Sequence, residues 1–363
     1  MSDNLRRYRA ILDTLRQLSP SPMTKQQARH LRTLAALISG IVGSRQTHLP
    51  AIASKVPDRT QRESRVKRFQ RWLANKHVSP DLSFLPFAHA LIQSLAHLPL
   101  VLVIDGSTVG RGCVALVVSV VYQQRALPIA WLVVTGRKGH FAEEMHVALV
   151  QRVQALIPAE ATVIFLGDGE FDGPGLQACL SDIGWAYVCR TARNIQIHSE
   201  GEWLTLGELY LQPGQMVSLP AVHMTRQLYG PVLVLAWWAR DQAEPIYLVT
   251  NLELAAEACW WYRKRFRIET FFSDQKSRGF HLHQSHLADP ARLMRLLLAA
   301  CLAYLWIIYL GVLAQRDGWM RMIHRTDRCD LSLFQLGLAL LEHLFNEGLP
   351  VPVAFHPPDL EVV

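Results

Sequence analysis

Five apolar runs of strand length follow one another in the middle of the chain. The runs are 99–105, 113–122, 127–135, 162–167 and 185–190. The links between the first three are short, which predicts an antiparallel meander. Apolar residues at helical spacing over 143–157 and 173–183 predict helices before and after the fourth run. The pattern therefore predicts three strands, a helix, a strand, a helix and a fifth strand.

This order of elements is typical of a ribonuclease-H-like mixed sheet, an α/β fold in which the fourth strand can pair alongside the first. Asp105 ends the first run and Asp168 follows the fourth. The two carboxylates would then lie at adjacent strand ends. Each aspartate precedes a glycine, Gly106 or Gly169, and taken alone is equally typical of a turn.

The pattern divides the chain into five regions. They are a helical, basic region (1–95), the first part of the ribonuclease-H-like core (96–190), a β-rich insertion (191–250), the remainder of the core with C-terminal helices (251–346), and an extended tail (347–363). Glycines and prolines separate short strand-like pieces in the insertion. Flanking helices are expected on the sheet, and the N-terminal region is expected to be all-helical.

One segment is apolar enough to resemble a membrane span. Residues 293–313 are apolar apart from Arg295 and a few small or aromatic residues, and about 20 apolar residues can cross a bilayer. This is the only such run in the sequence, so we predict a buried core helix and no membrane partner. A membrane-anchored protein is the alternative.

Positive charge is concentrated near the N-terminus. The chain carries a net charge of +7, with an isoelectric point near 9.2. Residues 1–99 hold 16 Lys and Arg against five Asp and Glu, a net charge of +11, whereas the remainder has −4. Residues 58–74 predict an arginine-rich helix that carries Arg62, Arg65 and Arg68. The charge favours double-stranded DNA as a partner over a merely solvated helix.

The cysteines and the N-terminus indicate the compartment. Six cysteines are scattered without a CxxC pair, and no histidine cluster stands beside them. This favours reduced thiols over a disulfide framework or a zinc site. Residues 1–15 are charged and amphipathic and lack the apolar core of a secretory signal. We therefore expect a cytoplasmic protein.

Four polar residues share one side of a predicted helix over 262–276. They are Tyr262, Arg265, Glu269 and Lys276, at offsets of 0, 3, 7 and 14. At about 100° per helical residue all four project from one narrow stripe. The carboxylate suits a hard cation, and the phenol and the two cations suit phosphate oxygens. A solvated helix face is the alternative.

Together with this glutamate, the two aspartates form a candidate metal site. Asp105, Asp168 and Glu269 would repel one another at a common point, so a shared site needs divalent metal. Two Mg²⁺ or Mn²⁺ ions can activate a water or a 3′-hydroxyl and stabilise the leaving oxygen. We expect these three residues to be catalytic metal ligands. Glu170 and Asp172 are the next candidates.

These motifs resemble those of the DDE transposases of bacterial insertion sequences, in the cut-and-paste group with a Tyr-x2-Arg-x3-Glu-x6-Lys signature. That signature matches over 262–276 without a gap, and IDGS at 104–107 and GDGEFDG at 167–173 resemble the two aspartate motifs. The resemblance covers about residues 100–310. It implies Mg²⁺- or Mn²⁺-dependent endonuclease cleavage at transposon ends, strand transfer, and a dimer in the synaptic complex.

The resemblance also assigns roles to single residues. Tyr262, Arg265 and Lys276 would hold transposon-end phosphates. Gly169 and Glu170 stand where the family often has an arginine, which is a departure from its second motif.

Further DNA contacts are expected from the insertion and from one loop. In this family the insertion often supplies a tryptophan that stacks on a flipped base, and Trp203, Trp237 and Trp238 are the candidates. Core packing is the alternative for each of them. In the loop 136–140, Arg137 and Lys138 could meet phosphate, or the loop could simply be solvated.

The resemblance favours a transposase that acts on terminal inverted repeats and target DNA at the nucleoid of a bacterial cell. Two other functions stay open. One is a structure-selective metal-dependent nuclease on the same fold. The other is a catalytically silent DNA-binding derivative, against which the intact set of three carboxylates argues.

Overall fold

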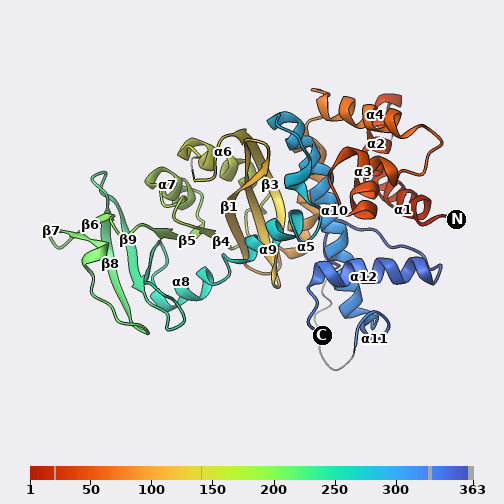
Figure 1. Cartoon of the computed structure of the whole chain (residues 1–363). Coiled ribbons are helices and arrows are strands. Elements are labelled where there is room, and N and C mark those ends of the chain that lie inside the picture. Colours follow the sequence, from red (N-terminus) through yellow and green to blue (C-terminus); the bar gives the residue numbers. More distant parts are fainter. Residues whose placement is uncertain (20–21, 140, 326–328, 359–363) are drawn as a thin grey trace.

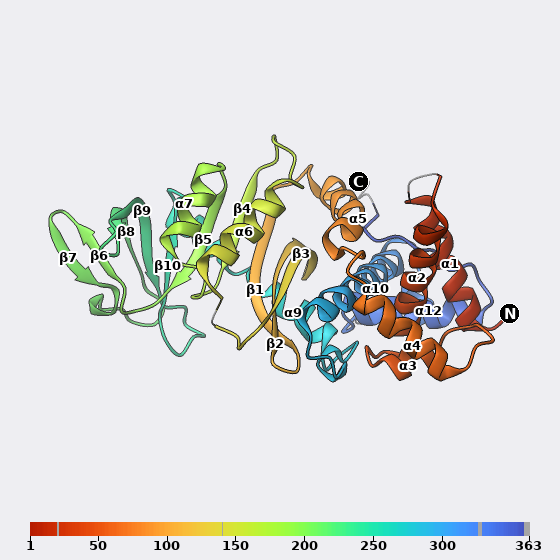
Figure 2. The same cartoon turned by 90° about the horizontal axis from the view of Figure 1, so that it is seen from above.

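The computed structural model describes residues 1–19, 22–139, 141–325 and 329–358. A helical region that contains the N-terminus lies at one end of the molecule, the β-rich insertion lies at the other, and the remaining sheet lies between them (Figures 1 and 2). His140 of the basic loop and residues 359–363 of the predicted tail lie outside the described residues. Residues 349–358 contain no helix or strand.

The first five strands form the predicted ribonuclease-H-like sheet. They are β1 (Leu100–Gly110), β2 (Cys113–Tyr122), β3 (Arg125–Thr135), β4 (Val163–Gly167) and β5 (Ala186–Thr191). β1, β2 and β3 pair as an antiparallel meander, while β4 runs parallel to β1 and β5 runs parallel to β4. Their residues are largely buried and apolar, as expected for strands covered on both faces. The predicted fold class is confirmed.

The β-rich insertion continues this same sheet. Its strands are β6 (Gln196–Ser199), β7 (Glu202–Thr205), β8 (Met216–Met224), β9 (Tyr229–Trp237) and β10 (Ile246–Thr250). β10 pairs antiparallel with β5, and β9, β8, β6 and β7 follow outward, which gives ten strands among the described residues. The sequence predicted the strands but not their place in the sheet, because pairing between distant segments sets that place.

Helix α10 (Pro290–Arg316) is the buried centre of the helical half and lies between the N-terminal helices and the sheet (Figure 2). In the described chain it is the one helix long and apolar enough to cross a membrane, and 94% of its most apolar window is buried inside the protein. The prediction of a core helix is confirmed. Its buried Arg295 donates hydrogen bonds to the carbonyls of Leu73 and Val78, at 3.0 and 2.9 Å, and so ties α10 to the N-terminal region.

The N-terminal region is helical, as predicted. It contains α1 (Asp3–Gln17), α2 (Lys25–Ser44), α3 (Leu49–Ser54), α4 (Arg62–Ala74) and α5 (Pro80–Leu95). Thr24 and Gln27 cap α2 reciprocally, because each side chain accepts from the other's backbone amide. α2, α4 and α5 all pack against α10, so these helices share one hydrophobic core with it.

The remaining helices cover the sheet or close the C-terminal end. They are α6 (Glu143–Gln154), α7 (Pro174–Asp182), α8 (Ala255–Tyr262), α9 (Arg267–Gln275), α11 (Met320–Ile323) and α12 (Leu333–Asn346). α9 packs on β1 and β3, and α6 packs on α7, β2 and β3. Gly337 lets α12 cross α10 closely, because a Cβ there would clash with the carbonyl of Ile307. The predicted helices after residue 286 are therefore present.

Candidate active site

Asp105 and Asp168 lie beside each other, but only Asp168 stands at a strand end. The prediction that Asp105 ends its strand is wrong, because β1 stays paired with β2 beyond Asp105 and continues to Gly110, whereas Asp168 directly follows β4. β1 and β4 are parallel, with Val103 opposite Leu166. Continuing this register by two residues places Asp105 opposite Asp168. Because side chains alternate between faces with a period of two, both carboxylates project from the same face of the sheet. The structure thus brings the two aspartates together.

Asp105 is almost fully buried and faces two cations. Its relative exposure is 2%. Lys138 Nζ lies 3.0 Å from its Oδ1, and Arg265 Nη1 lies 3.9 Å from its Oδ2. Burial raises the pKa of Asp105, and the charge of Asp168 adds to that rise, whereas Lys138 and Arg265 oppose it. The fold therefore disfavours the ionised form of Asp105, and a further positive charge beside it would stabilise that form.

The prediction of one continuous helix over 262–276 is wrong. The chain forms α8 and α9, separated by residues 263–266. The amides of Lys264, Arg265 and Arg267 donate to carbonyls three residues back, which is the bonding of tight turns. Residues 263–266 include no Gly or Pro, so local propensity does not explain the break. The break between the two helices coincides with the contacts that the Arg265 side chain makes with Asp105 and Glu269.

Arg265 and Lys276 both reach the first strand. Arg265 Nη2 donates to Glu269 Oε1 at 2.8 Å, while its Nη1 faces Asp105. Lys276 Nζ donates to Ser107 Oγ at 2.6 Å, and Ser107 lies two residues beyond Asp105 on β1. Lys276 follows the last residue of α9 and has a non-helical backbone. The two cations are thus placed by separate elements rather than by one helical stripe.

Tyr262 lies beside Arg265 and Arg190 and within the electrostatic reach of Asp168. Burial raises the pKa of this phenol to about 12, although the two arginines oppose the rise. The hydroxyl is therefore protonated at neutral pH and can donate a hydrogen bond.

The structure does not gather Glu269 with the two aspartates. Its side chain is 46% exposed and is paired with Arg265. Among the described residues, no group of three or more Asp, Glu, His or Cys side chains could hold a metal ion. Glu170 lies within electrostatic reach of both aspartates, because burial and then the charges of Asp168 and Asp105 raise its pKa. Its amide also donates to Asp168 Oδ1 at 3.0 Å.

The other reserve candidate has a structural role. Asp172 Oδ2 accepts a hydrogen bond of 2.6 Å from Thr191 Oγ1, and the backbone carbonyl of Asp172 accepts one from Gln177 Nε2 at 2.8 Å. Of the two reserve carboxylates, only Glu170 belongs to the electrostatic surroundings of Asp105.

The donor set at the two aspartates fits a hard divalent cation. Carboxylate oxygens are the ligands that Mg²⁺ and Mn²⁺ prefer, and Mg²⁺ is usually held by one or two carboxylates together with substrate phosphates. Asp105 and Asp168 supply that number. The cations around them are Lys138, Arg265 and, through Ser107, Lys276; these would meet the phosphate rather than the metal.

Two hollows flank this site on the insertion side and share Arg190. The first, of about 750 Å³, is lined by Asp168, Arg190, Arg193, Tyr210 and Trp238 among others. The second, of about 650 Å³, is lined by Arg190, Trp237, Tyr262, Arg263, Arg265 and Phe266 among others. Arg190 lies in β5, so the strand-end argument that picked out the aspartates could also have identified it.

The three candidate tryptophans occupy different places. The guanidinium of Arg263 lies over the ring of Trp237, 5.0 Å from its centroid. Trp238 Nε1 donates to the carbonyl of Gln242 at 3.0 Å. Trp203 is 47% exposed on the outer strand β7 and lines neither of the two hollows. Only Trp237 and Trp238 therefore stand next to the site.

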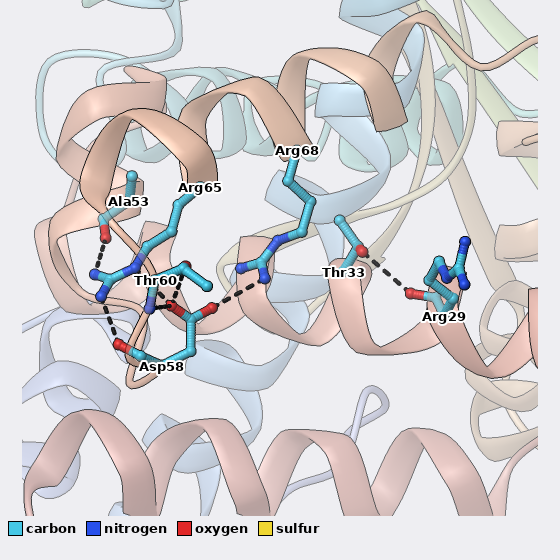
Figure 3. Close-up of polar contacts among 7 residues, drawn as sticks. All are labelled: Arg29, Thr33, Ala53, Asp58, Thr60, Arg65 and Arg68. Atoms are coloured by element: carbon cyan, nitrogen blue, oxygen red, sulfur yellow. Dashed lines mark hydrogen bonds and ion pairs between the residues drawn. The ribbon is translucent and has the colours of Figure 1, made fainter.

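The three N-terminal arginines predicted to bind DNA all make contacts within the protein. Arg65 donates from Nε to Asp58 Oδ1 at 2.7 Å and from Nη1 to the carbonyl of Ala53 at 3.0 Å (Figure 3). Arg68 Nη1 lies 2.9 Å from Asp58 Oδ2. Arg62 is exposed and donates to the carbonyl of Pro50 at 3.2 Å. In the loop after β3, Arg137 is exposed, while Lys138 contacts Asp105.

Comparisons with known proteins identify the family of the chain and support its fold. A family model described as a transposase DDE domain matches residues 96–306. A search of curated proteins finds no match. One matching solved structure is a "Cryo-EM structure of piggyBac transposase synaptic complex with hairpin DNA (SNHP)", 13% identical, with a TM-score of 0.50, over 99% of this chain and 83% of that chain. That likeness supports the fold alone. The family model covers more than half of the sequence, and the chain belongs to the family of transposases with a DDE domain.

Proposed function

We propose that this transposase cleaves DNA at the ends of a mobile element in a metal-dependent reaction and then transfers the strand, as in cut-and-paste transposition. The observation that carries the proposal is the in-register pair Asp105 and Asp168 with Lys138, Arg265 and Lys276 around it. Carboxylates for a metal and cations for phosphate oxygens are what phosphodiester cleavage requires.

Asp105 and Asp168 would hold Mg²⁺ or Mn²⁺, as two ions when DNA is bound; the metal would lower the pKa of an attacking water and stabilise the leaving oxygen. The side chains around them orient the strand. Arg265 offers a planar fork and Lys276 a point charge. Tyr262 donates a hydrogen bond to a phosphate oxygen from its protonated hydroxyl. Together these groups hold the scissile phosphate at the aspartates.

Glu269 completes the ligand set once DNA competes for Arg265. Its carboxylate is bound to Arg265 at 2.8 Å and is 46% exposed. A phosphodiester binds the same guanidinium fork, so an arriving strand would release Glu269. We assign Glu269 as the third catalytic carboxylate on this basis.

The partner in this proposal is double-stranded DNA, namely the terminal inverted repeats and the target. The excess of positive charge in residues 1–99 supports it. Trp237 and Trp238, which line the two hollows, are the residues that would stack on an extruded base. A dimer in the synaptic complex, a bacterial insertion sequence as the mobile element, and the nucleoid in the cytoplasm as the place of reaction are further parts of the proposal.

The test is a cleavage assay on the DNA that flanks this gene. Purified protein is incubated with a duplex that carries the flanking inverted repeats and with Mg²⁺ or Mn²⁺. We expect cuts at the repeat ends and a joined product, and neither with Asp105→Asn. Cleavage without joining would indicate a structure-selective nuclease. Binding without cleavage in both metals would indicate a silent DNA-binding derivative.

A further inference from the structure

A second concentration of cations surrounds a hollow in the N-terminal region, away from the aspartates. The hollow has a volume of about 400 Å³ and lies between α1, α2, the loop before α4, and α4 itself. The polar residues that matter in its lining are Tyr8, Arg29, Arg32, Asp58 and Arg68. Three arginines therefore line a hollow that has a single carboxylate in its lining.

Both oxygens of that carboxylate, Asp58, already have partners within the protein. Asp58 Oδ1 accepts from Thr60 Oγ1 at 2.6 Å and from Arg65 Nε at 2.7 Å, and Oδ2 pairs with Arg68 Nη1 at 2.9 Å (Figure 3). Burial alone would raise the pKa of Asp58, but the hydrogen bonds from Thr60, Arg68 and Arg65 outweigh it and lower the pKa. Asp58 thus acts as a clamp between the loop and α4. Both of its carboxylate oxygens are already paired, so it does not neutralise Arg29 or Arg32.

The remaining donors of the hollow lack acceptors. Neither Arg29 nor Arg32 has an ion-pair partner within the part of the chain that the structure describes, and both are exposed. Arg68 Nε is buried without a hydrogen-bond partner, which normally destabilises a folded protein. The phenol of Tyr8 lies within the electrostatic reach of Arg32 and Arg68. The lining therefore offers donors and positive charge in excess.

We propose that this hollow is a seat for a phosphate group, and that its occupant is a backbone phosphodiester of duplex DNA lying across the N-terminal helices. Guanidinium forks bind the oxygens of phosphate in a bidentate manner, and contacts to phosphates position a protein on a duplex without reading its sequence. The inference rests on the proposed function, since it names the contact that the basic N-terminal region makes.

The experiment uses the full chain and a duplex oligonucleotide, with EDTA present so that no cleavage occurs. The variant Arg29→Gln/Arg32→Gln is compared with Lys67→Gln/Arg71→Gln, which removes the same charge from exposed positions of α4 outside the hollow. Duplex affinity is measured over a series of salt concentrations. We expect the first variant to lose about 10-fold or more in affinity and about one unit of salt slope, and the control to lose less of both.

Inorganic phosphate provides the second readout. It should protect the wild type and the control variant against thermal unfolding more than it protects Arg29→Gln/Arg32→Gln. A further variant, Arg29→Lys/Arg32→Lys, keeps the charge but not the fork and should recover part of the duplex affinity, which would also show that the fold is intact.

The outcomes separate this inference from the proposed function. Wild-type affinity, salt slope and phosphate protection in Arg29→Gln/Arg32→Gln would overturn the phosphate seat and leave cleavage at the aspartates untouched. Loss of phosphate protection with unchanged duplex affinity would mean that the hollow takes a free oxyanion, which also overturns it. If the wild-type chain binds no duplex, both the phosphate seat and the proposed function are overturned. If it binds the duplex but does not cleave it, only the proposed activity is overturned.

Discussion

Two aspartates in this chain each face two cations, yet their surroundings give them opposite properties. The Asp105 side chain is 3% exposed and its pKa is raised, first by burial and then by Asp168, despite Lys138 and Arg265. The Asp58 side chain is 31% exposed, and hydrogen bonds from Thr60 and two arginines lower its pKa in spite of partial burial. The difference between them lies in burial and hydrogen bonding, since both have cationic neighbours.

The comparison separates a reactive carboxylate from a structural one. Asp105 receives a backbone hydrogen bond from Gly106 and an ammonium from Lys138, which do not outweigh desolvation. Asp58 has its oxygens occupied by side chains from its own loop and from α4. A carboxylate of the first kind is available to a metal, and one of the second kind holds helices together.

The largest expected effect is on cleavage. Asp105→Asn or Asp168→Asn should lower cleavage at transposon ends by more than about 100-fold, because even the outer partners of metal ligands contribute 10–100-fold. Glu269→Gln should do the same, while duplex binding stays near wild type. Without metal, Asp105→Asn should also raise the melting temperature at neutral pH, because burial penalises the charged form.

Cleavage assays and thermal unfolding in EDTA check both statements. Retained cleavage in either aspartate variant would move the catalytic role to Glu170, and Glu170→Gln would then be the next variant to assay.

A buried ion pair provides a third aspartate for the comparison. Asp274 accepts from Arg125 at 2.7 Å, yet burial raises its pKa from 3.8 to about 6. The folded state then binds the proton more tightly, so this group lowers the stability as pH rises from about 4 to 6, by on the order of 3 kcal/mol in total. Above about pH 7 its contribution is constant.

Urea denaturation of wild type and Asp274→Asn across that pH range isolates the contribution. The difference between the two free energies of unfolding should change with pH only inside the window. Parallel curves would mean that Arg125 offsets the desolvation of Asp274 fully.

The clamp at Asp58 should matter for stability and not for catalysis. Asp58→Ala leaves Arg65 and Arg68 without their partner and should destabilise the protein by about 2 kcal/mol. Asp81→Ala is the matched control, because Asp81 pairs with Arg152 at 2.8 Å but both side chains are more than 40% exposed. That control should change the free energy of unfolding by less than about 1 kcal/mol. Equal effects of the two substitutions, measured by chemical denaturation, would remove the distinction between the pairs.

The smallest expected effect concerns the cations around the aspartates. Arg265→Ala and Lys276→Ala should each weaken binding to a transposon-end duplex by about 10-fold and lower cleavage, since each removes one charged contact to phosphate. The affinity of the free protein for Mn²⁺ should not fall, because neither side chain can be a ligand. Calorimetric titration with Mn²⁺ alone gives the answer. A loss of Mn²⁺ binding in either variant would show that these residues organise the metal site directly.

Prediction from the sequence succeeded where a property depends on near neighbours. The apolar run 113–122 became β2 with the same ends, and the capping pair Thr24 and Gln27 starts α2. Asp105 and Asp168 could be found because each directly follows the apolar residues of a run that the pattern already defined, although β1 extends past Asp105 to Gly110. Prediction failed at 263–266, where a helix expected from spacing is interrupted although its residues favour a helix.

By itself, the sequence determined the order of strands and helices, the concentration of positive charge near the N-terminus, and the spacing of Tyr262, Arg265, Glu269 and Lys276. The tertiary structure alone decided that β10 joins β5, that Lys138 and Arg265 converge on Asp105, and that Asp58 holds Arg65 and Arg68. The reason is physical. Propensity and apolar periodicity act over a few residues, whereas strand pairing, desolvation and ion pairing depend on groups that only folding brings together.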